Sequence, residues 1–248
     1  MLQYAHAELA PQRSSRSRYI PPSNVQIAKL SDILNYCRRP IGDGQNDLFR
    51  RDGEAEPEIY LAGDPGLLLR PSVSVIGARN VSSDGVRRAG RIAREMARAG
   101  IVVTSGLAKG VDAAAHHGAL DAGGATIAVI GTPLDKSYPI ENAELQQEIW
   151  QRHLLVSQFK PGQRTFPSDF PKRNRLMAQL TDASIIVEAS DTSGTLHQAA
   201  ECTRLGRWLF IMKSVAEDPK LSWPAKFLGY PKVAILETPT DVIERVSR

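Results

Sequence analysis

The stretch Ser72-Val73-Ser74-Val75-Ile76-Gly77 is a short apolar run that ends at a glycine. A serine at position 82 or 83 then suits the cap of a helix, and Gly100 suits its end. The apolar positions of this helix follow a helical spacing and are Val86, Ala89, Ile92, Ala93 and Met96. The next apolar run, residues 101–104, ends at Ser105-Gly106. This order predicts a strand, a helix and a second strand.

The same alternation continues to the end of the chain. Further strands are predicted at residues 126–130, 154–158, 184–188, 208–212 and 233–236. Further helices are predicted at residues 111–122, 142–152, 174–180, 195–205 and 240–246. Repeated β–α units favour an α/β fold, a doubly wound and mostly parallel sheet with helices on both faces.

The N-terminal part lacks this alternation. Residues 1–22 are polar, and we expect a loose arm there. Residues 25–37 have the apolar spacing of one short helix, and residues 42–58 resemble a linker. The predicted division is therefore an arm, helix and linker over residues 1–58 and an α/β domain over residues 59–248.

Composition limits the function classes. The chain has 248 residues, 42% of them hydrophobic, and a formal net charge of +4, which permits a polyanionic partner. Basic residues are concentrated in residues 70–109 and 160–175. Cys37 and Cys202 lack the spacing of metal ligands, so we expect reduced buried thiols, no metal and no cofactor. No apolar run approaches the ~18 residues of a membrane span, so we expect a cytoplasmic protein that does not enter a membrane.

The segment Phe170-Pro171-Lys172-Arg173-Asn174-Arg175 places three cations beside an aromatic ring. Cations can contact phosphates and a flat ring can stack on an unpaired base, so this composition suits a nucleic-acid groove. The alternative is an ordinary solvated face of the protein.

Three predicted strands end in turns that contain glycine, at residues 77–79, 105–110 and 131–133. Ligands of doubly wound sheets bind at the carboxyl ends of strands, and glycine lets backbone amides approach an anion. Arg79 and Lys109 add full charges at this edge. The alternative is that the glycines only permit tight turns. Neither the dinucleotide nor the nucleoside-triphosphate glycine motif occurs, which disfavours both ligands.

The sequence offers little support for catalysis. His116 and His117 follow Asp112, but no nucleophile accompanies them, so packing or capping is the favoured interpretation. Common hydrolase and metalloprotease motifs do not occur. We therefore predict no catalytic residues.

Residues 59–212 resemble the bacterial DNA-processing protein family of natural transformation, called DprA or Smf. The stretches that carry the resemblance occur in family order, at residues 77–85, 105–120, 126–142, 170–175 and 188–196. Gln158 stands where the family usually has Glu, and the chain ends too early for the winged-helix domain of many members. We therefore expect a minimal or divergent member.

The resemblance implies an extended Rossmann-like domain that binds single-stranded DNA in a basic pocket, forms a homodimer and helps to load a RecA-type recombinase. The DNA-binding residues that it implies are Gly77, Arg79, Ser105, Gly106, Lys109, Phe170, Lys172, Arg173, Asn174 and Arg175. Contacts to a nucleotide or phosphate are expected at Ser193, Gly194 and Thr195.

Other classes of function stay open. Phosphoribohydrolases that release bases from nucleoside monophosphates resemble this fold, but Gln198 stands at the position of their Glu. A neutral amide can bind a ribose hydroxyl but cannot act as a carboxylate base. The remaining alternatives are a nucleotide-binding sensor and a partner that neutralises a toxin or serves phage defence.

Overall fold

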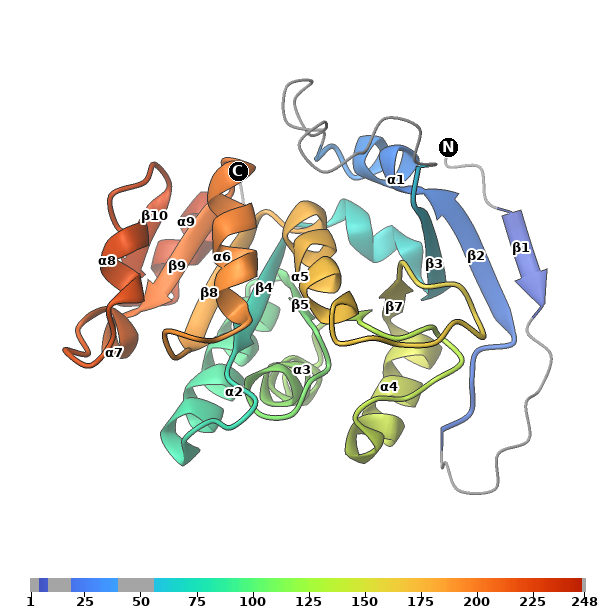
Figure 1. Ribbon diagram of the computed structural model, residues 1–248, viewed down its shortest axis with the longest axis horizontal. Coiled ribbons are helices and arrows are strands. Elements are labelled where there is room, and N and C mark those ends of the chain that lie inside the picture. Colours follow the sequence, from blue (N-terminus) through green and yellow to red (C-terminus); the bar gives the residue numbers. More distant parts are fainter. Residues whose placement is uncertain (1–4, 9–18, 40–55, 247–248) are drawn as a thin grey trace.

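A single mixed sheet forms the centre of the molecule (Figure 1). The computed structural model describes residues 5–8, 19–39 and 56–246. Within these ranges the strands are β1 (Ala5–Glu8), β2 (Asn24–Lys29), β3 (Glu58–Gly63), β4 (Ser72–Gly77), β5 (Val102–Ser105), β6 (Thr126–Ile130), β7 (Leu154–Ser157), β8 (Ala183–Glu188), β9 (Trp208–Met212) and β10 (Val233–Leu236). Their order across the sheet is β1-β2-β3-β7-β6-β5-β4-β8-β9-β10.

The direction of the strand order reverses between β4 and β8. From β4 the chain adds β5, β6 and β7 on one side, and it then returns to place β8, β9 and β10 on the other. These seven strands pair in parallel, whereas β1, β2 and β3 form an antiparallel edge next to β7. A parallel sheet leaves a crevice where its order reverses, beyond the carboxyl ends of the strands. From this topology we expect a ligand crevice beyond the carboxyl ends of β4 and β8.

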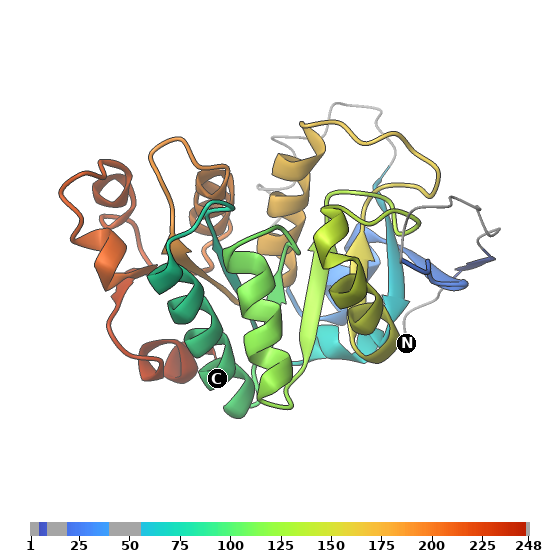
Figure 2. The same ribbon diagram turned by 90° about the horizontal axis from the view of Figure 1, so that it is seen from below.

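Helices cover both faces of the sheet, as Figure 2 shows. Side chains of α2 (Ser83–Arg98), α3 (Val111–Asp121), α4 (Ala143–Arg152) and α9 (Thr240–Val246) pack on one face. Side chains of α1 (Leu30–Tyr36), α5 (Asp169–Leu180), α6 (Thr195–Arg204) and α8 (Trp223–Phe227) pack on the other. Neighbouring residues of one strand point to opposite faces of the sheet, since Val75 packs against the first group of helices and Ile76 against the second. The predicted doubly wound α/β fold is confirmed.

The predicted helix α2 follows its sequence signals closely. Ser82 caps it, because its hydroxyl accepts a hydrogen bond of 3.0 Å from the Gly85 amide. Gly100 follows its end at φ +77°, a conformation that glycine adopts at little cost. Four of the five predicted apolar positions are buried, but Val86 is exposed.

The prediction of one helix over residues 25–37 was wrong for its first half. Residues 24–29 form β2, and α1 begins only at Leu30. The strand pairs with β3 and buries Val25 and Ala28, so the neighbouring strand outweighs the local helical spacing. This segment shares the sheet with the rest of the chain, and the division at residue 58 stays a prediction. Most of the predicted arm and linker lies outside the described residues, but the prediction of a loose arm was wrong for Ala5–Glu8, which pairs with β2 as β1.

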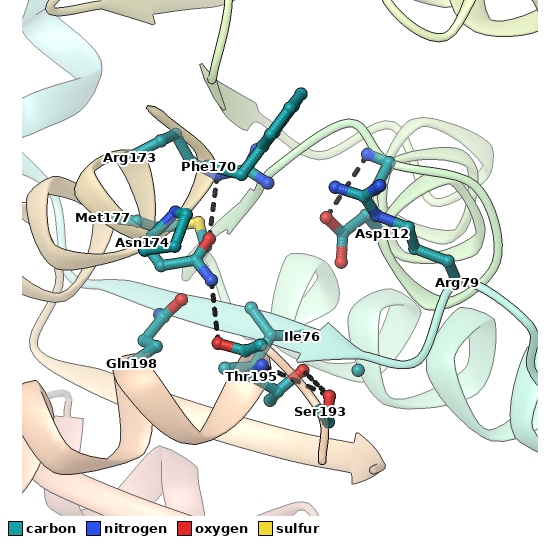
Figure 3. A pocket seen from close by; sticks show the side chains of 14 residues that line it. Ile76, Arg79, Asp112, Phe170, Arg173, Asn174, Met177, Ser193, Thr195 and Gln198 are labelled. Atoms are coloured by element: carbon teal, nitrogen blue, oxygen red, sulfur yellow. Dashed lines mark hydrogen bonds between the residues drawn. The ribbon is translucent and has the colours of Figure 1, made fainter. Parts of the chain in front are cut away.

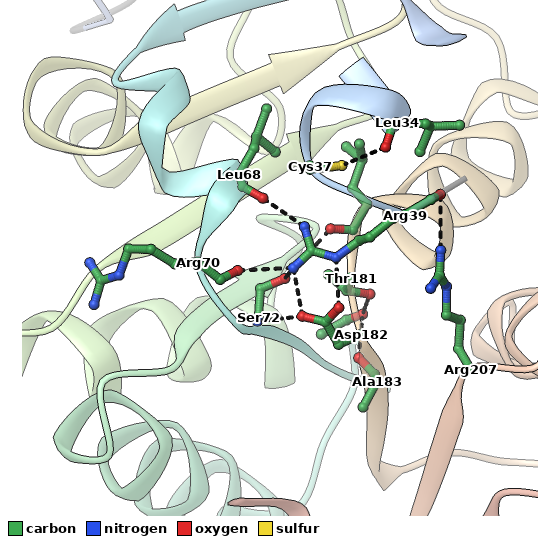
Figure 4. Close-up of polar contacts among 12 residues, drawn as sticks. Leu34, Cys37, Arg39, Leu68, Arg70, Ser72, Thr181, Asp182, Ala183 and Arg207 are labelled. Carbon is green, nitrogen blue, oxygen red and sulfur yellow. Dashed lines mark hydrogen bonds and ion pairs between the residues drawn. The ribbon is translucent and has the colours of Figure 1, made fainter. Parts of the chain in front are cut away.

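Arg39 fastens the end of the N-terminal segment to the amino ends of β4 and β8 (Figure 4). Its Nε and Nη2 atoms donate to the Asp182 carboxylate at 2.7 and 2.5 Å. It also donates to the carbonyl oxygens of Leu68 and Arg70. Asp182 in turn accepts the Ser72 amide at 2.9 Å, so one ion pair joins three segments on the edge opposite the crevice.

Three further elements complete the fold. The short helices η1 (Pro65–Leu69) and η2 (Ile140–Asn142) lie in connections, and α7 (Lys213–Ala216) follows β9. Neither α7 nor α8 was predicted. Cys37 and Cys202 are buried free thiols, as expected. Across the described ranges, no helix has the length and apolar character needed to cross a bilayer.

Candidate nucleic-acid interface

A pocket of about 190 Å³ lies at the crevice between β4 and β8 (Figure 3). It is enclosed by the end of β4 and by residues near the starts of α3, α5 and α6. The residues around it are Ile76, Gly77, Arg79, Ala108, Asp112, Phe170, Pro171, Arg173, Asn174, Met177, Ser193, Gly194, Thr195 and Gln198. The fold thus brings together four sequence stretches that were described separately: residues 77–79, 105–110, 170–175 and 188–196.

The pocket continues into two neighbouring hollows. One, of about 60 Å³, shares Arg79 and Phe170 with it and reaches Lys109 and Tyr138. The other, of about 690 Å³, shares Arg79 and Ser193 and extends along the end of β8. The three hollows form one groove along the carboxyl edge of the sheet, which we call the edge groove. Because each hollow is partly open to solvent, the edge groove differs from one closed pit for a small molecule.

Arg79 stands where the three hollows meet. Its side chain is exposed, and its Cζ atom lies 4.9 Å from the centre of the Phe170 ring. Nowhere in the described part of the chain does an acidic side chain pair with it. A guanidinium held on an aromatic face keeps its charge and its hydrogen-bond donors available. Arg79 is therefore well placed to meet an anion.

Phe170 occupies the second position of α5, which begins at Asp169, five residues earlier than predicted. Pro171 is compatible with this start, because amides of the first turn need no partner within the helix. The ring is half-buried and lies against Gly131, where an added Cβ would come within 2.6 Å of the Phe170 Cδ1 atom. Gly131 therefore admits the aromatic ring to the edge groove.

Arg173 is buried and serves the protein itself. Its Nη1 atom donates to the backbone carbonyl oxygens of Gly106 and Val129, the latter at 2.7 Å. An added Cβ at Gly106 would collide with this guanidinium. Gly77 is similarly crowded, because its Cβ would lie 2.7 Å from a Val111 methyl group. Close packing thus explains both glycines, and their predicted contacts with phosphates stay a prediction.

Asp112 is a buried acid in the wall of the pocket, and it was not among the predicted site residues. Its carboxylate accepts a hydrogen bond of 3.3 Å from the Ala108 amide. Burial raises the pKa of Asp112, while the charges of Arg173 and Arg79 act in the opposite direction. When ionised, Asp112 offsets part of the positive charge at this site.

The basic segment 170–175 divides between two sides of α5. Phe170, Arg173 and Asn174 face the pocket, whereas Lys172 and Arg175 lie outside the three hollows. Successive helical residues are turned by about 100°, so six neighbours cannot share one face. Lys172 instead pairs with Asp169 at 3.4 Å. The expected convergence of the whole segment is therefore not what the structure shows.

The other predicted contacts are similarly uneven. Lys109 lines the smallest hollow, but its Nζ atom pairs with Glu141 at 2.5 Å and both side chains are more than half exposed. Ser105 is buried, and its hydroxyl donates to the Val75 carbonyl at 2.7 Å. Asn174 donates from Nδ2 to the Gly194 carbonyl at 3.2 Å, which joins α5 to the start of α6.

Residues Ser193, Gly194 and Thr195 form the start of α6 at the pocket. The Ser193 hydroxyl accepts the Thr195 amide at 3.2 Å and donates to the Thr195 hydroxyl at 2.9 Å. The positive end of the α6 dipole therefore points toward the edge groove and favours negative charge there.

The residues suspected of catalysis have structural partners. Gln198 is buried, and its Nε2 atom donates to the hydroxyls of Ser74 and Ser184 at 2.9 and 3.1 Å. His116 is buried beside the Thr126 hydroxyl at 2.7 Å, away from the edge groove. Burial and the nearby positive charges lower its pKa to about 3, so it packs as a neutral ring. In the ranges that the structure describes, no cluster of acids, histidines and cysteines could hold a metal ion.

Comparison with known proteins places the chain in a family. The model of the family described as DNA recombination-mediator protein A matches residues 47–246. The chain belongs to the DNA recombination-mediator protein A family. The resemblance first found on the glycine turns and the basic segment is thereby confirmed.

Members of the recombination-mediator family from several bacteria are similar to the chain. The DNA processing protein DprA of Streptococcus pneumoniae is 40% identical over 154 residues, 62% of the chain and 54% of that protein. The Bacillus subtilis DprA is 30% identical over 84% of the chain and 70% of the relative. The chain thus spans about half to two thirds of the length of these relatives.

A solved structure of the family extends the match over almost the whole chain. DNA processing protein A of Helicobacter pylori, described for its single-stranded DNA binding mode, superposes with a TM-score of 0.69 at 27% identity. The match covers 98% of the chain and 95% of that structure.

Proposed function

We propose that the chain binds single-stranded DNA along the edge groove and has no catalytic role. The observation that carries this proposal is that three hollows meet at Arg79, and that Phe170 lines two of them. An open groove with a cation and a stacking ring accommodates a polymer, whereas a single nucleotide is better served by an enclosed pocket. The single-stranded DNA binding mode described for the Helicobacter pylori relative supports the same ligand.

The residues have different parts in this proposal. Arg79 contacts a phosphate, and the start of α6 at Ser193 and Thr195 receives a second one. Phe170 supports an unpaired base. Lys109 contacts DNA only when a phosphate replaces Glu141 as its partner, because Lys109 and Glu141 form an ion pair in the free protein. Arg173 supports the groove from beneath, with its donors on backbone carbonyls.

Fluorescence anisotropy with a labelled oligothymidylate tests the proposal. Replacing Arg79 by Ala removes an unpaired guanidinium, so we expect at least a tenfold loss of affinity. The slope of log affinity against log salt should fall by about 0.7 for each lost phosphate contact with a single strand. Arg91→Ala is the matched control, because this exposed arginine of α2 lies outside the three hollows. Equal affinity of both variants and the unaltered protein would disprove the binding site.

Nucleotide hydrolysis is the alternative that needs its own test. Gln198 holds two buried hydroxyls and has no carboxylate to act at a ribose. Incubation with nucleoside monophosphates should therefore release no free base. Chromatographic detection of a base, lost in a Gln198→Ala variant, would replace the DNA-binding proposal with an enzymatic one.

Assembly and partners are also proposals. The family resemblance supports a homodimer and an interaction with a RecA-type recombinase in the cytoplasm. Analytical ultracentrifugation measures the first, and co-sedimentation with a recombinase filament on single-stranded DNA measures the second. A monomer at all concentrations would disprove the homodimer.

A further inference from the structure

Two loops beside the edge groove are hydrogen-bonded to each other. One, residues 131–139, follows β6, and the other, residues 158–168, connects β7 to α5. Lys136 Nζ donates to the Gln163 carbonyl at 2.7 Å, and the Gly162 amide donates to Asp135 at 3.0 Å. We call this pair the joined loops. Because hydrogen bonds connect them, they present one surface next to the smallest hollow.

The joined loops expose two aromatic rings. Tyr138 is 52% exposed and Phe166 is 48% exposed, although rings of this size usually gain by burial. Tyr138 lines the smallest hollow, and its ring centre lies 5.5 Å from that of Phe170 at an angle of 46°. The Cζ atom of the Arg164 guanidinium lies 5.5 Å from the centre of the Phe166 ring. About half of each residue is therefore exposed to solvent.

The charge around these rings is mainly positive. Lys160 and Arg164 are exposed, and Lys136 adds a third cation. The acids near these rings have partners: Asp135 accepts the Gly162 amide, Asp169 accepts the Phe166 amide at 2.9 Å, and Glu141 pairs with Lys109. Aromatic rings that alternate with cations are the usual surface for a single strand of nucleic acid.

We propose that single-stranded DNA leaves the edge groove over Tyr138 and continues across the joined loops to Phe166, with both rings stacking on bases. This proposal rests on the proposed function, because it extends the path of the same ligand. Phe170 and Tyr138 form the first part of this DNA path, since their ring centres lie 5.5 Å apart in the free protein. Phe166 and Arg164 form the second, which only a longer strand reaches.

Oligothymidylates of two lengths separate these steps. Site sizes of single-strand binding folds run from about 4 to about 16 nucleotides, so we choose probes of about 4 and about 15. Tyr138→Ala should lower the affinity for both probes by roughly 5-fold or more, the loss expected for one stacked base. Phe166→Ala should weaken only the longer probe. Tyr138→Phe keeps the ring and should bind like the unaltered protein.

Tyr230→Ala is the matched control. Tyr230 is 55% exposed but lies beside β10, at the far end of the sheet from the joined loops. Photocrosslinking of the unaltered protein to a 5-iodouracil oligonucleotide gives a second readout that needs no variant. Crosslinked peptides should contain Tyr138 and, with the longer probe, Phe166.

The outcomes distinguish this path from the binding site itself. Normal affinity of Tyr138→Ala and Phe166→Ala, together with a weakened Arg79→Ala, overturns the path and leaves the proposed function intact. The same holds if Tyr138→Ala changes only the sedimentation of the protein, which would mark a protein contact. If the unaltered chain binds neither probe, the proposed function fails and the path fails with it.

Discussion

Replacing Arg173 by Ala should destabilise the protein before it affects any ligand. Only 4% of this residue is exposed, and its Nη1 atom donates hydrogen bonds to the carbonyl oxygens of Gly106 and Val129. The substitution leaves both carbonyls without this donor and removes the charge that most strongly lowers the pKa of the buried Asp112 carboxylate. Removing one member of a buried charged pair typically costs about 3–5 kcal/mol. We expect the free energy of unfolding to fall by this amount.

Urea denaturation followed by circular dichroism measures the change. In a chain of this size, about 3–5 kcal/mol corresponds to a Tm lower by roughly 6–20 °C. Arg79→Ala is the control, because Arg79 is exposed and its loss should cost less than about 0.5 kcal/mol. An unfolding midpoint of Arg173→Ala equal to that of the unaltered protein would contradict the structural role. A stable variant with impaired DNA binding would make Arg173 a direct DNA contact instead.

Two further perturbations test the site and the core. Gly131→Ala places a methyl group 2.6 Å from the Phe170 ring and should weaken oligothymidylate binding about 5-fold or more in anisotropy titrations, whereas Gly229→Ala has open space and should bind normally. His116 has a folded-state pKa of about 3, below its usual 6.5, so the unfolded chain takes up its proton first and stability falls as the pH drops below 6.5. At pH 5 this loss of folding stability is about 2 kcal/mol. In urea titrations at several pH values, His116→Gln should remove this part of the pH dependence. If stability depends on pH as steeply in the variant as in the unaltered protein, the His116 ring is not buried in its neutral form.

Local sequence patterns were sufficient for most of the fold. Apolar runs that end in glycine identified β4, β5 and β6, and the cap at Ser82 identified the start of α2. These signals are local, because a strand needs its apolar run and a helix needs its cap and spacing. The strand β2 was missed, since its burial depends on pairing with β3, a partner about 30 residues away in the chain.

The candidate site was predicted only in part. Arg79 and Phe170 both line the edge groove, because Arg79 follows the end of β4 and α5 places the Phe170 ring beside it. Their contacts with DNA stay a prediction. Arg173 also lines the edge groove, but its hydrogen bonds to two buried carbonyl oxygens could not be predicted from its neighbours in the sequence. Lys172 belongs to the same basic segment and lies outside the groove, because helical geometry turns it away.

The sequence by itself determined the alternation of strands and helices, the glycine turns and the membership of the family, since each depends on residues close together in the chain. The tertiary structure alone decided which cations remain available. Lys109 is held by Glu141, and Arg173 is held by backbone carbonyls, whereas Arg79 rests on Phe170 with its charge unpaired in the described part of the molecule. A charge contributes to binding according to the partners that the fold brings to it, and those partners come from distant segments.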